Sequence, residues 1–197
     1  MRVGVIADTH LPSLIRSMDE LGSVTGEFLT TVDLILHAGD VTAPSVLDWL
    51  EQFAPIFVAR GNNDIFDHPS LSDGHLLEIE GWRIGLTHEL RPESRPIEEL
   101  KQQCFPGEEI DILIAGDTHV ERLECREGVV FLNPGSPTLP HHKEVRLGTI
   151  GLLDLSVDVI HAEVIVLGDT VGSPNPGLPQ ELKVTRHQLE KGRNNAL

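Results

Sequence analysis

Short apolar runs, each ending in a polar cluster, are the feature that most constrains how this chain folds. Three of these runs predict strands at residues 3–7, 34–38 and 56–60, and apolar residues at helical spacing between them predict helices over 13–32 and 43–53. Alternation of strands and helices is typical of a parallel sheet. Because the carboxyl ends of parallel strands share one edge, the residues that follow these runs are expected to meet in space.

The rest of the chain is predicted to be rich in strands. A hairpin is expected at residues 76–79 and 83–87, with its turn at Glu80-Gly81, and a helix is expected over 96–104. Further strands are predicted at residues 112–115, 123–126, 129–133, 147–155 and 157–166. The pattern indicates an α/β fold in which two mixed sheets form a sandwich flanked by helices.

Pro and Gly interrupt the chain after the last of these predicted strands. Residues 172–179 read Gly-Ser-Pro-Asn-Pro-Gly-Leu-Pro, a composition typical of a linker because neither residue type favours regular structure. The sequence therefore predicts one domain over residues 1–167, followed by a linker and a C-terminal tail over 168–197.

Composition narrows the possible functions. With 197 residues and 40% hydrophobic content, the chain can bury one full core. The net charge of −16 disfavours stable binding of duplex nucleic acid, and no apolar stretch approaches the roughly 20 residues of a membrane helix. Cys104 and Cys125 lack the spacing of a zinc site and fit a reducing compartment, so a cytoplasmic protein is expected.

The polar clusters at the strand ends contain residues that bind divalent cations. They are Asp8-Thr9-His10, Gly39-Asp40, Gly61-Asn62-Asn63-Asp64 and Gly116-Asp117-Thr118-His119. Carboxylate, imidazole and amide groups are ligands for borderline and hard divalent metals. Taken alone, Asp8-Thr9-His10 fits a helix N-cap followed by a surface histidine equally well. Placement at four successive strand ends favours a two-metal hydrolytic centre, in which the two oxygens of Asp40 can serve both cations.

The order and spacing of these clusters resemble the calcineurin-like metallophosphoesterase superfamily, with its D-x-H, G-D, G-N-x-D/E, lone His and G-H-x-H motifs. The chain is most similar to the branch of short YfcE/MJ0936-type phosphodiesterases and the retromer subunit Vps29. The segment Asn133-Pro134-Gly135-Ser136 adds to this resemblance. The resemblance covers residues 1–167. It implies a four-layer α/β/β/α sandwich of two mixed sheets, with the metals at the carboxyl ends of the strands.

The resemblance also implies roles for individual residues. One metal would be held by Asp8, His10, Asp40 and His119, and the other by Asp40, Asn62, His88 and Asp117. The candidate catalytic residues are Asp40, Asn62, Asn63 and His119. The implied activity is hydrolysis of phosphate esters, above all small phosphodiesters or nucleotides, by a hydroxide that bridges the metals. The implied cofactors are two divalent metal ions, Mn first, with Fe, Mg, Zn or Ni as alternatives.

Three positions depart from the family pattern. Asp117 replaces the first histidine of G-H-x-H, which adds negative charge and favours harder cations. Asn63 stands where many members carry a histidine that protonates the leaving group, and an amide cannot act as a general acid. Glu89 follows His88 either as part of the rim of the site or as a solvated carboxylate.

Two readings of the function follow. The expected partner of an enzyme is a small phosphate-ester substrate, with no duplex nucleic acid and no membrane, and self-association stays an open alternative. The second reading is a metal-poor, Vps29-like scaffold that binds proteins. Of the other polar residues, His37, Arg60 and Asp64 are interpreted as orienting or structural groups, and contact of His141-His142 with substrate is left open.

Overall fold

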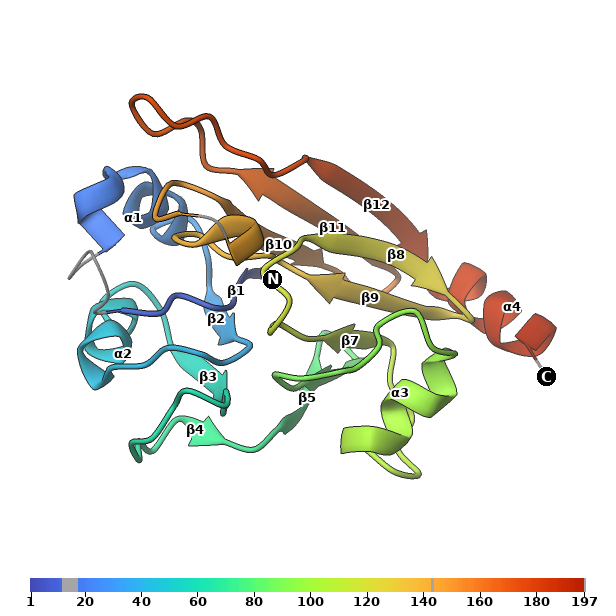
Figure 1. The fold of residues 1–197 in the computed structure, drawn as a ribbon. Helices are drawn as coiled ribbons and strands as arrows, with labels where there is room; N and C mark the ends of the chain where they lie inside the picture. Colours follow the sequence, from blue (N-terminus) through green and yellow to red (C-terminus); the bar gives the residue numbers. More distant parts are fainter. Residues whose placement is uncertain (12–17, 143, 197) are drawn as a thin grey trace.

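The computed structural model describes residues 1–11, 18–142 and 144–196, which form two β-sheets with short helices around them (Figure 1). The strands are β1 (Arg2–Ile6), β2 (Leu34–His37), β3 (Ile56–Ala59), β4 (Leu71–Ser72), β5 (His75–Ile79), β6 (Trp82–Leu86), β7 (Ile112–Ile114), β8 (Arg122–Arg126), β9 (Val129–Asn133), β10 (Thr149–Leu155), β11 (Val159–Val166) and β12 (Gln180–Thr185). The helices are α1 (Val24–Leu29), α2 (Pro44–Leu50), α3 (Ile97–Cys104) and α4 (Arg186–Ala196), with 3-10 turns η1 (Met18–Leu21) and η2 (Pro140–His142).

Both sheets are mixed. The first has the order β12-β11-β10-β1-β2-β3-β4 and the second has the order β5-β6-β7-β9-β8. In the first sheet β1, β2, β3 and β4 run parallel, while β10, β11 and β12 pair antiparallel. In the second, β6, β7 and β9 run parallel between two antiparallel edge strands. The parallel strands in each sheet direct their carboxyl ends to a common edge.

Side chains along each strand alternate between the two faces of its sheet, and the molecule has four layers: helices, first sheet, second sheet and helix. Val5 and Leu36 point into the core between the sheets, while Ile6 and Ile35 point to the opposite face, which α1 and α2 cover. On the outer face of the second sheet, Leu100 of α3 lies in a third apolar cluster. Figure 1 shows α1 and α2 together at one side of the molecule and α3 at the other. The α/β/β/α sandwich expected from the sequence is therefore confirmed.

The C-terminal part of the chain differs from the prediction. The fold does not end near Leu167, because β12 pairs antiparallel with β11 along the edge of the first sheet. After it, α4 buries Leu189 in the core between the sheets, where 1% of this residue is exposed. The Pro- and Gly-rich stretch is a connection between β11 and β12. Its composition is typical of a linker, so the sequence pattern does not predict the short strand that follows.

The first predicted helix is also different. Residues 13–17 lie outside the described part of the chain, and the remainder of the predicted 13–32 helix is reduced to η1 and α1. Gly22 separates the two with a φ of +115°, a backbone conformation that a continuous helix cannot contain. The second helix is shorter than predicted, whereas the β5–β6 hairpin and α3 match their predictions. Within the described residues, no helix has the length and apolar character needed to cross a bilayer.

Substitution of Leu189 tests whether α4 belongs to the core. Leu189→Ala is expected to lower the free energy of unfolding by about 2–5 kcal/mol, because it removes a fully buried side chain. Leu178→Ala is the matched control, since Leu178 is 66% exposed and its loss should change stability by about 0.5 kcal/mol or less. Urea unfolding measures both variants. Equal stability of the two would show that α4 does not pack as described.

Candidate metal centre

Five of the predicted ligands lie shortly after a strand and have a left-handed backbone conformation. Asp8 and His10 follow β1 with φ of 56° and 48°, Asp40 follows β2 with φ of 57°, and Asp117 and His119 follow β7 with φ of 69° and 56°. Asp and His tolerate this region better than most other residues. These backbone turns bring the side chains of separate strands together at the sheet edge.

Asp8, His10 and His119 form the first ligand group. Their ligand atoms lie within 4.8 Å of one another, and Nε2 of His10 is 3.1 Å from Nε2 of His119. Nδ1–H of His119 donates to the carbonyl of Leu139 over 2.8 Å, which leaves the lone pair on Nε2. Burial lowers the pKa of His119 to about 4, so the ring is neutral at pH 7. A neutral imidazole with Nε2 turned inward is suited to bind a divalent cation.

His88, Asn62 and Asp117 form a second group beside the first. Nδ1–H of His88 donates to the carbonyl of Ala38 over 2.7 Å, so Nε2 carries the lone pair. This Nε2 lies 3.1 Å from Oδ1 of Asn62 and 3.7 Å from Oδ1 of Asp117. Three acceptor atoms thus face one another, an arrangement that a cation between them would stabilise.

Asp40 lies between the two groups. Its Oδ2 is 3.2 Å from Nε2 of His10, and its Oδ1 is 3.5 Å from Nε2 of His88. Asn63 holds this carboxylate, because its backbone N–H donates to Oδ1 over 2.9 Å and its side-chain amide donates to Oδ2 over 2.6 Å. Each oxygen of Asp40 therefore faces a histidine of a different group. Asp8 is also shared, since its carboxylate lies within 4.8 Å of ligand atoms of Asp40 and His88.

Two glycines allow the loops after β2 and β3 to approach each other. A Cβ on Gly61 would collide with Oδ1 of Asp40, and a Cβ on Gly39 would lie 2.8 Å from the backbone nitrogen of Gly61. Buried Asp64 ties the two loops together, because its carboxylate accepts the backbone N–H groups of Asp40 and Gly61. The clusters after β2 and β3 therefore form a single structural unit.

His37 of β2 is buried behind the centre. Its Nδ1 accepts the backbone N–H of Gly39 over 3.1 Å, and its Nε2 lies 3.3 Å from Oγ1 of Thr9. Burial lowers the pKa of His37 to about 3, so its ring is neutral. His37 orients the turns that carry the ligands and does not belong to either ligand group.

Negative charge is concentrated in this buried region. Asp8 is fully buried, and among the described residues its Oδ2 has no hydrogen-bond partner. Burial, together with the Asp40 carboxylate, raises the pKa of Asp8 well above its usual value. Burial also opposes ionisation of Asp40, but hydrogen bonds from His10 and Asn63 hold its pKa below the usual value. An unpartnered carboxylate oxygen beside inward-facing imidazoles fits a bound divalent cation.

The structure brings all the predicted site residues into one cluster and adds side chains that the sequence analysis missed. Arg91 is one of them: its Nε donates to Oδ2 of Asp117 over 2.6 Å. Glu93 is another, because it accepts the side-chain amide of Asn133 over 2.7 Å, and the same amide donates to the carbonyl of Gly116 over 2.9 Å. Both lie in the loop after β6 and not at a strand end, so no periodic pattern marks them.

The His141-His142 turn lies against the first ligand group. The ring of His142 packs on the ring of His119 with 3.7 Å between centroids. Nε2 of His141 is 2.9 Å from Oε2 of Glu121, and Oε1 of this buried glutamate accepts the backbone N–H of Leu178. The turn is therefore fixed between the metal centre and the connection that leads to β12.

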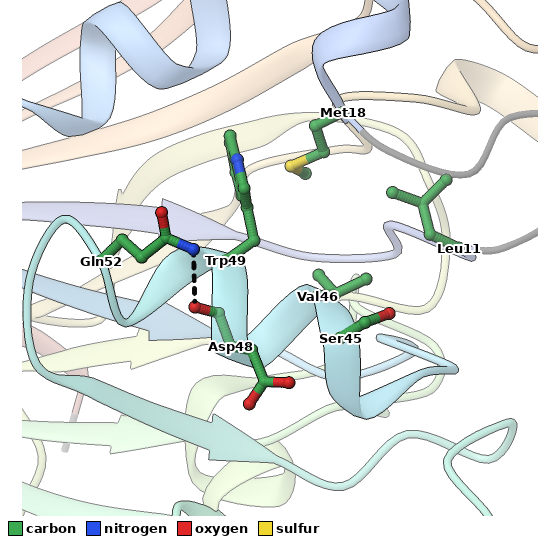
Figure 2. A pocket seen from close by; sticks show the side chains of 7 residues that line it. All are labelled: Leu11, Met18, Ser45, Val46, Asp48, Trp49 and Gln52. Atoms are coloured by element: carbon green, nitrogen blue, oxygen red, sulfur yellow. Dashed lines mark hydrogen bonds between the residues drawn. The ribbon is translucent and has the colours of Figure 1, made fainter.

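A separate groove of about 330 Å³ lies along α2 (Figure 2). It is lined by Leu11, Met18, Ser45, Val46, Asp48, Trp49 and Gln52. Figure 2 shows Trp49 and Met18 facing each other across it, with the amide of Gln52 bonded to the Asp48 carbonyl. The groove is mainly apolar and contains none of the predicted ligands, so the chemistry of the centre lies outside it.

Comparison with known protein families agrees with this geometry. Residues 1–158 match the calcineurin-like phosphoesterase superfamily domain. The chain belongs to this superfamily. A probable metallophosphoesterase of Methanothermobacter thermautotrophicus is 36% identical over 173 residues, which cover 87% of this chain and 95% of the relative. The family binds divalent metals, and the clustered His and Asp side chains include groups that could hold such an ion.

A further relative agrees with the branch that the sequence indicated, and a solved structure shares the fold. Phosphodiesterase MJ0936 of Methanocaldococcus jannaschii is 23% identical over 150 residues, covering 68% of this chain and 83% of that protein. Wild-type Vps29 of Entamoeba histolytica, crystallised as a complex with Zn²⁺, has a TM-score of 0.70 and 24% identity, covering 94% of this chain and 99% of that chain. The likeness to Vps29 shows a shared fold.

Thermal unfolding with added metal tests the role of the buried carboxylate. Saturating Mn²⁺ is expected to raise the Tm of the wild type, because a cation that binds only the folded state stabilises it. Asp8→Asn should lose most of this shift, since it removes the unpartnered oxygen from both ligand groups. Asp73→Asn is the control, because the Asp73 side chain is 99% exposed. An equal Mn²⁺-induced shift in Asp8→Asn and the wild type would contradict the assignment.

Proposed function

We propose that this protein is a dinuclear metal-dependent phosphoesterase that acts on small phosphodiesters or nucleotides. The observation that carries the proposal is the position of Asp40, whose two oxygens lie 3.2 Å and 3.5 Å from inward-facing histidines of separate ligand groups. The family relationship supports phosphoesterase activity in general. The named phosphodiesterase among the relatives favours diesters for this chain too.

Two bound divalent cations would act as Lewis acids toward the phosphate and lower the pKa of a water molecule to near neutrality. The chain's own residues prepare the site for them. Ala38 and Leu139 accept the Nδ1–H groups of His88 and His119 and thereby keep both Nε2 atoms available. Asn63 fixes the Asp40 carboxylate, and exposed Asn62 presents its amide oxygen at the mouth of the site.

Manganese is the proposed metal. The two positions combine carboxylate, amide and imidazole ligands, and Asp117 makes the second position richer in oxygen than a histidine there would. Oxygen-rich sites favour Mn²⁺, Fe²⁺ or Mg²⁺ over softer cations. The two free thiols, Cys104 and Cys125, are consistent with the cytoplasmic location that we propose.

A metal-poor protein-binding scaffold is the second candidate function. Two sequence departures favour it: Asn63 lacks a titratable proton, and Asp117 adds a charge that weakens Lewis acidity at the second position. The preserved cluster of ligands argues for the enzyme, because a surface that only binds proteins does not require buried, inward-facing histidines. Metal analysis and an assay of purified protein distinguish the two functions.

Replacement of Asp40 tests the bridging role. Asp40→Ala is expected to lower kcat by at least about 100-fold and to reduce bound metal at both positions, because even partners of metal ligands can contribute this much. Asp154→Ala, at a half-exposed carboxylate paired with Arg2, serves as the control. Metal content by mass spectrometry and turnover of bis(p-nitrophenyl) phosphate are the measurements. Near-normal turnover with two metals bound would show that Asp40 is not a bridge.

The leaving group provides a second test. Asn63 donates to Asp40 through its backbone N–H and its side-chain amide, and an amide has no titratable proton, so an alkoxide leaving group lacks the roughly 10²- to 10⁴-fold assistance that a general acid can supply. The rate for a series of diesters should fall as the pKa of the leaving alcohol rises. Asn63→His should reduce that dependence. If the wild-type rate does not change with the pKa of the leaving alcohol, and chemistry is shown to limit the rate, this role of Asn63 is refuted.

A further inference from the structure

Arg91 brings a permanent positive charge to the edge of the metal centre. Among the described Lys and Arg side chains, it is the one with a nitrogen within 4.0 Å of a carboxylate oxygen of the proposed ligands. Its Nε donates to Oδ2 of Asp117, while Oδ1 of the same carboxylate lies 3.7 Å from Nε2 of His88. A single carboxylate therefore separates the guanidinium from the second ligand group.

Arg91 is held in place but still accessible. Its Nε lies 3.4 Å from Oε1 of Glu89, and its backbone N–H donates to Oε1 of Gln103. The Arg91 side chain is 61% exposed, whereas that of Asp117 is 7% exposed. In the described part of the chain, no hydrogen-bond partner reaches Nη1. A guanidinium that docks one edge on a buried carboxylate presents its other edge outward, in the geometry by which arginine binds phosphate oxygens.

The number of phosphate oxygens limits what Arg91 can bind. A phosphodiester has two non-bridging oxygens, and a dinuclear centre can engage both. A diester with an uncharged leaving group then has no anionic oxygen left for Arg91. A leaving group that is itself a phosphate supplies one. The position of Arg91 beyond Asp117 therefore favours substrates that carry a second phosphate next to the one attacked.

Asn63 favours the same class of substrate for an independent reason. Its backbone N–H and one hydrogen of its side-chain amide donate to Asp40, and an amide has no titratable proton to give to a leaving alkoxide. A phosphate has a second pKa of about 6 and leaves without being protonated at neutral pH. A phosphoanhydride thus satisfies both features: it needs no proton from residue 63, and its leaving phosphate provides the anion for Arg91.

We propose that this protein hydrolyses phosphoanhydrides, such as those of dinucleoside pyrophosphates, and that Arg91 binds the leaving phosphate. The inference rests on the proposed phosphoesterase function and narrows its substrate class. The oxygen of water bonds to one phosphorus, and the bond from that phosphorus to the bridging oxygen breaks. The bridging oxygen keeps the electron pair and departs with the second phosphate. The protons of the water pass to solvent or to the products.

Arg91→Ala tests the proposal through the difference between two substrates. In the Mn²⁺-loaded protein, the loss of kcat/KM should be about 10- to 100-fold larger for diadenosine diphosphate than for bis(p-nitrophenyl) phosphate, because one charge-assisted hydrogen bond is lost only with the anhydride. Arg91→Lys keeps the charge without the planar fork and should fall between wild type and Arg91→Ala. Arg95→Ala is the matched control, since Arg95 lies in the same loop, is half-exposed and, within the described residues, has its side chain paired only with Glu99.

Calorimetry gives a readout that is independent of turnover. Methylenediphosphonate, which carries two phosphorus groups, should bind the Mn²⁺-loaded wild type at least tenfold more tightly than Arg91→Ala, while inorganic phosphate should discriminate less. If Arg91→Ala loses kcat/KM equally on both substrates and also binds Mn²⁺ more weakly, Arg91 only neutralises the charge of Asp117. That result would overturn the proposal. Activity of the wild type on the diester with none on the anhydride overturns it as well and leaves the phosphoesterase function intact. A wild type inactive on both substrates overturns the two together.

Discussion

The structure of the centre depends on the electrostatic cost of burying carboxylates close together. Asp8 is fully buried with one oxygen unpartnered, and Asp40 lies nearby with 3% of its surface exposed. Buried charges of like sign are costly unless a cation or hydrogen bonds compensate for them. The surrounding groups are arranged accordingly: amide and backbone donors hold Asp40, and the neutral rings of His37 and His119 add no competing positive charge. A site of this kind is suited to bind cations.

The two sheets have to pack in one particular way for these groups to meet. Asp8 and Asp40 come from the first sheet, whereas His88 and His119 come from the second, so the apolar core between the sheets sets the distances among the ligands. The loops that carry these ligands can approach each other closely only because Gly61 and Gly39 have no side chain. Changes in core packing far from the centre are therefore expected to disturb metal binding before they unfold the protein.

The sequence was sufficient to predict which polar side chains meet at the edge of the sheet, but not the groups that surround them. Asp8, Asp40 and His119 each follow an apolar run, and the parallel sheet makes their convergence predictable. The position of Arg91 depends on the path of an irregular loop, which no periodicity describes. The strand β12 was missed because Pro and Gly precede it, although its pairing with β11 is extensive. The predicted 13–32 helix is interrupted at Gly22, whose positive φ ends the turn before it.

The pairing of β1 with β10 has a consequence for synthesis of the chain. The amino group of Met1 donates to the carbonyl of Leu155, which lies 154 positions later in the chain. One edge of β1 therefore has no strand to pair with until β10 has been synthesised. All of the proposed metal ligands, the last of which is His119, emerge from the ribosome before that partner does. Contacts of such long range slow folding and leave strand edges open in the interim. The nascent chain thus carries the complete set of proposed ligands on a sheet whose last strands have yet to pair.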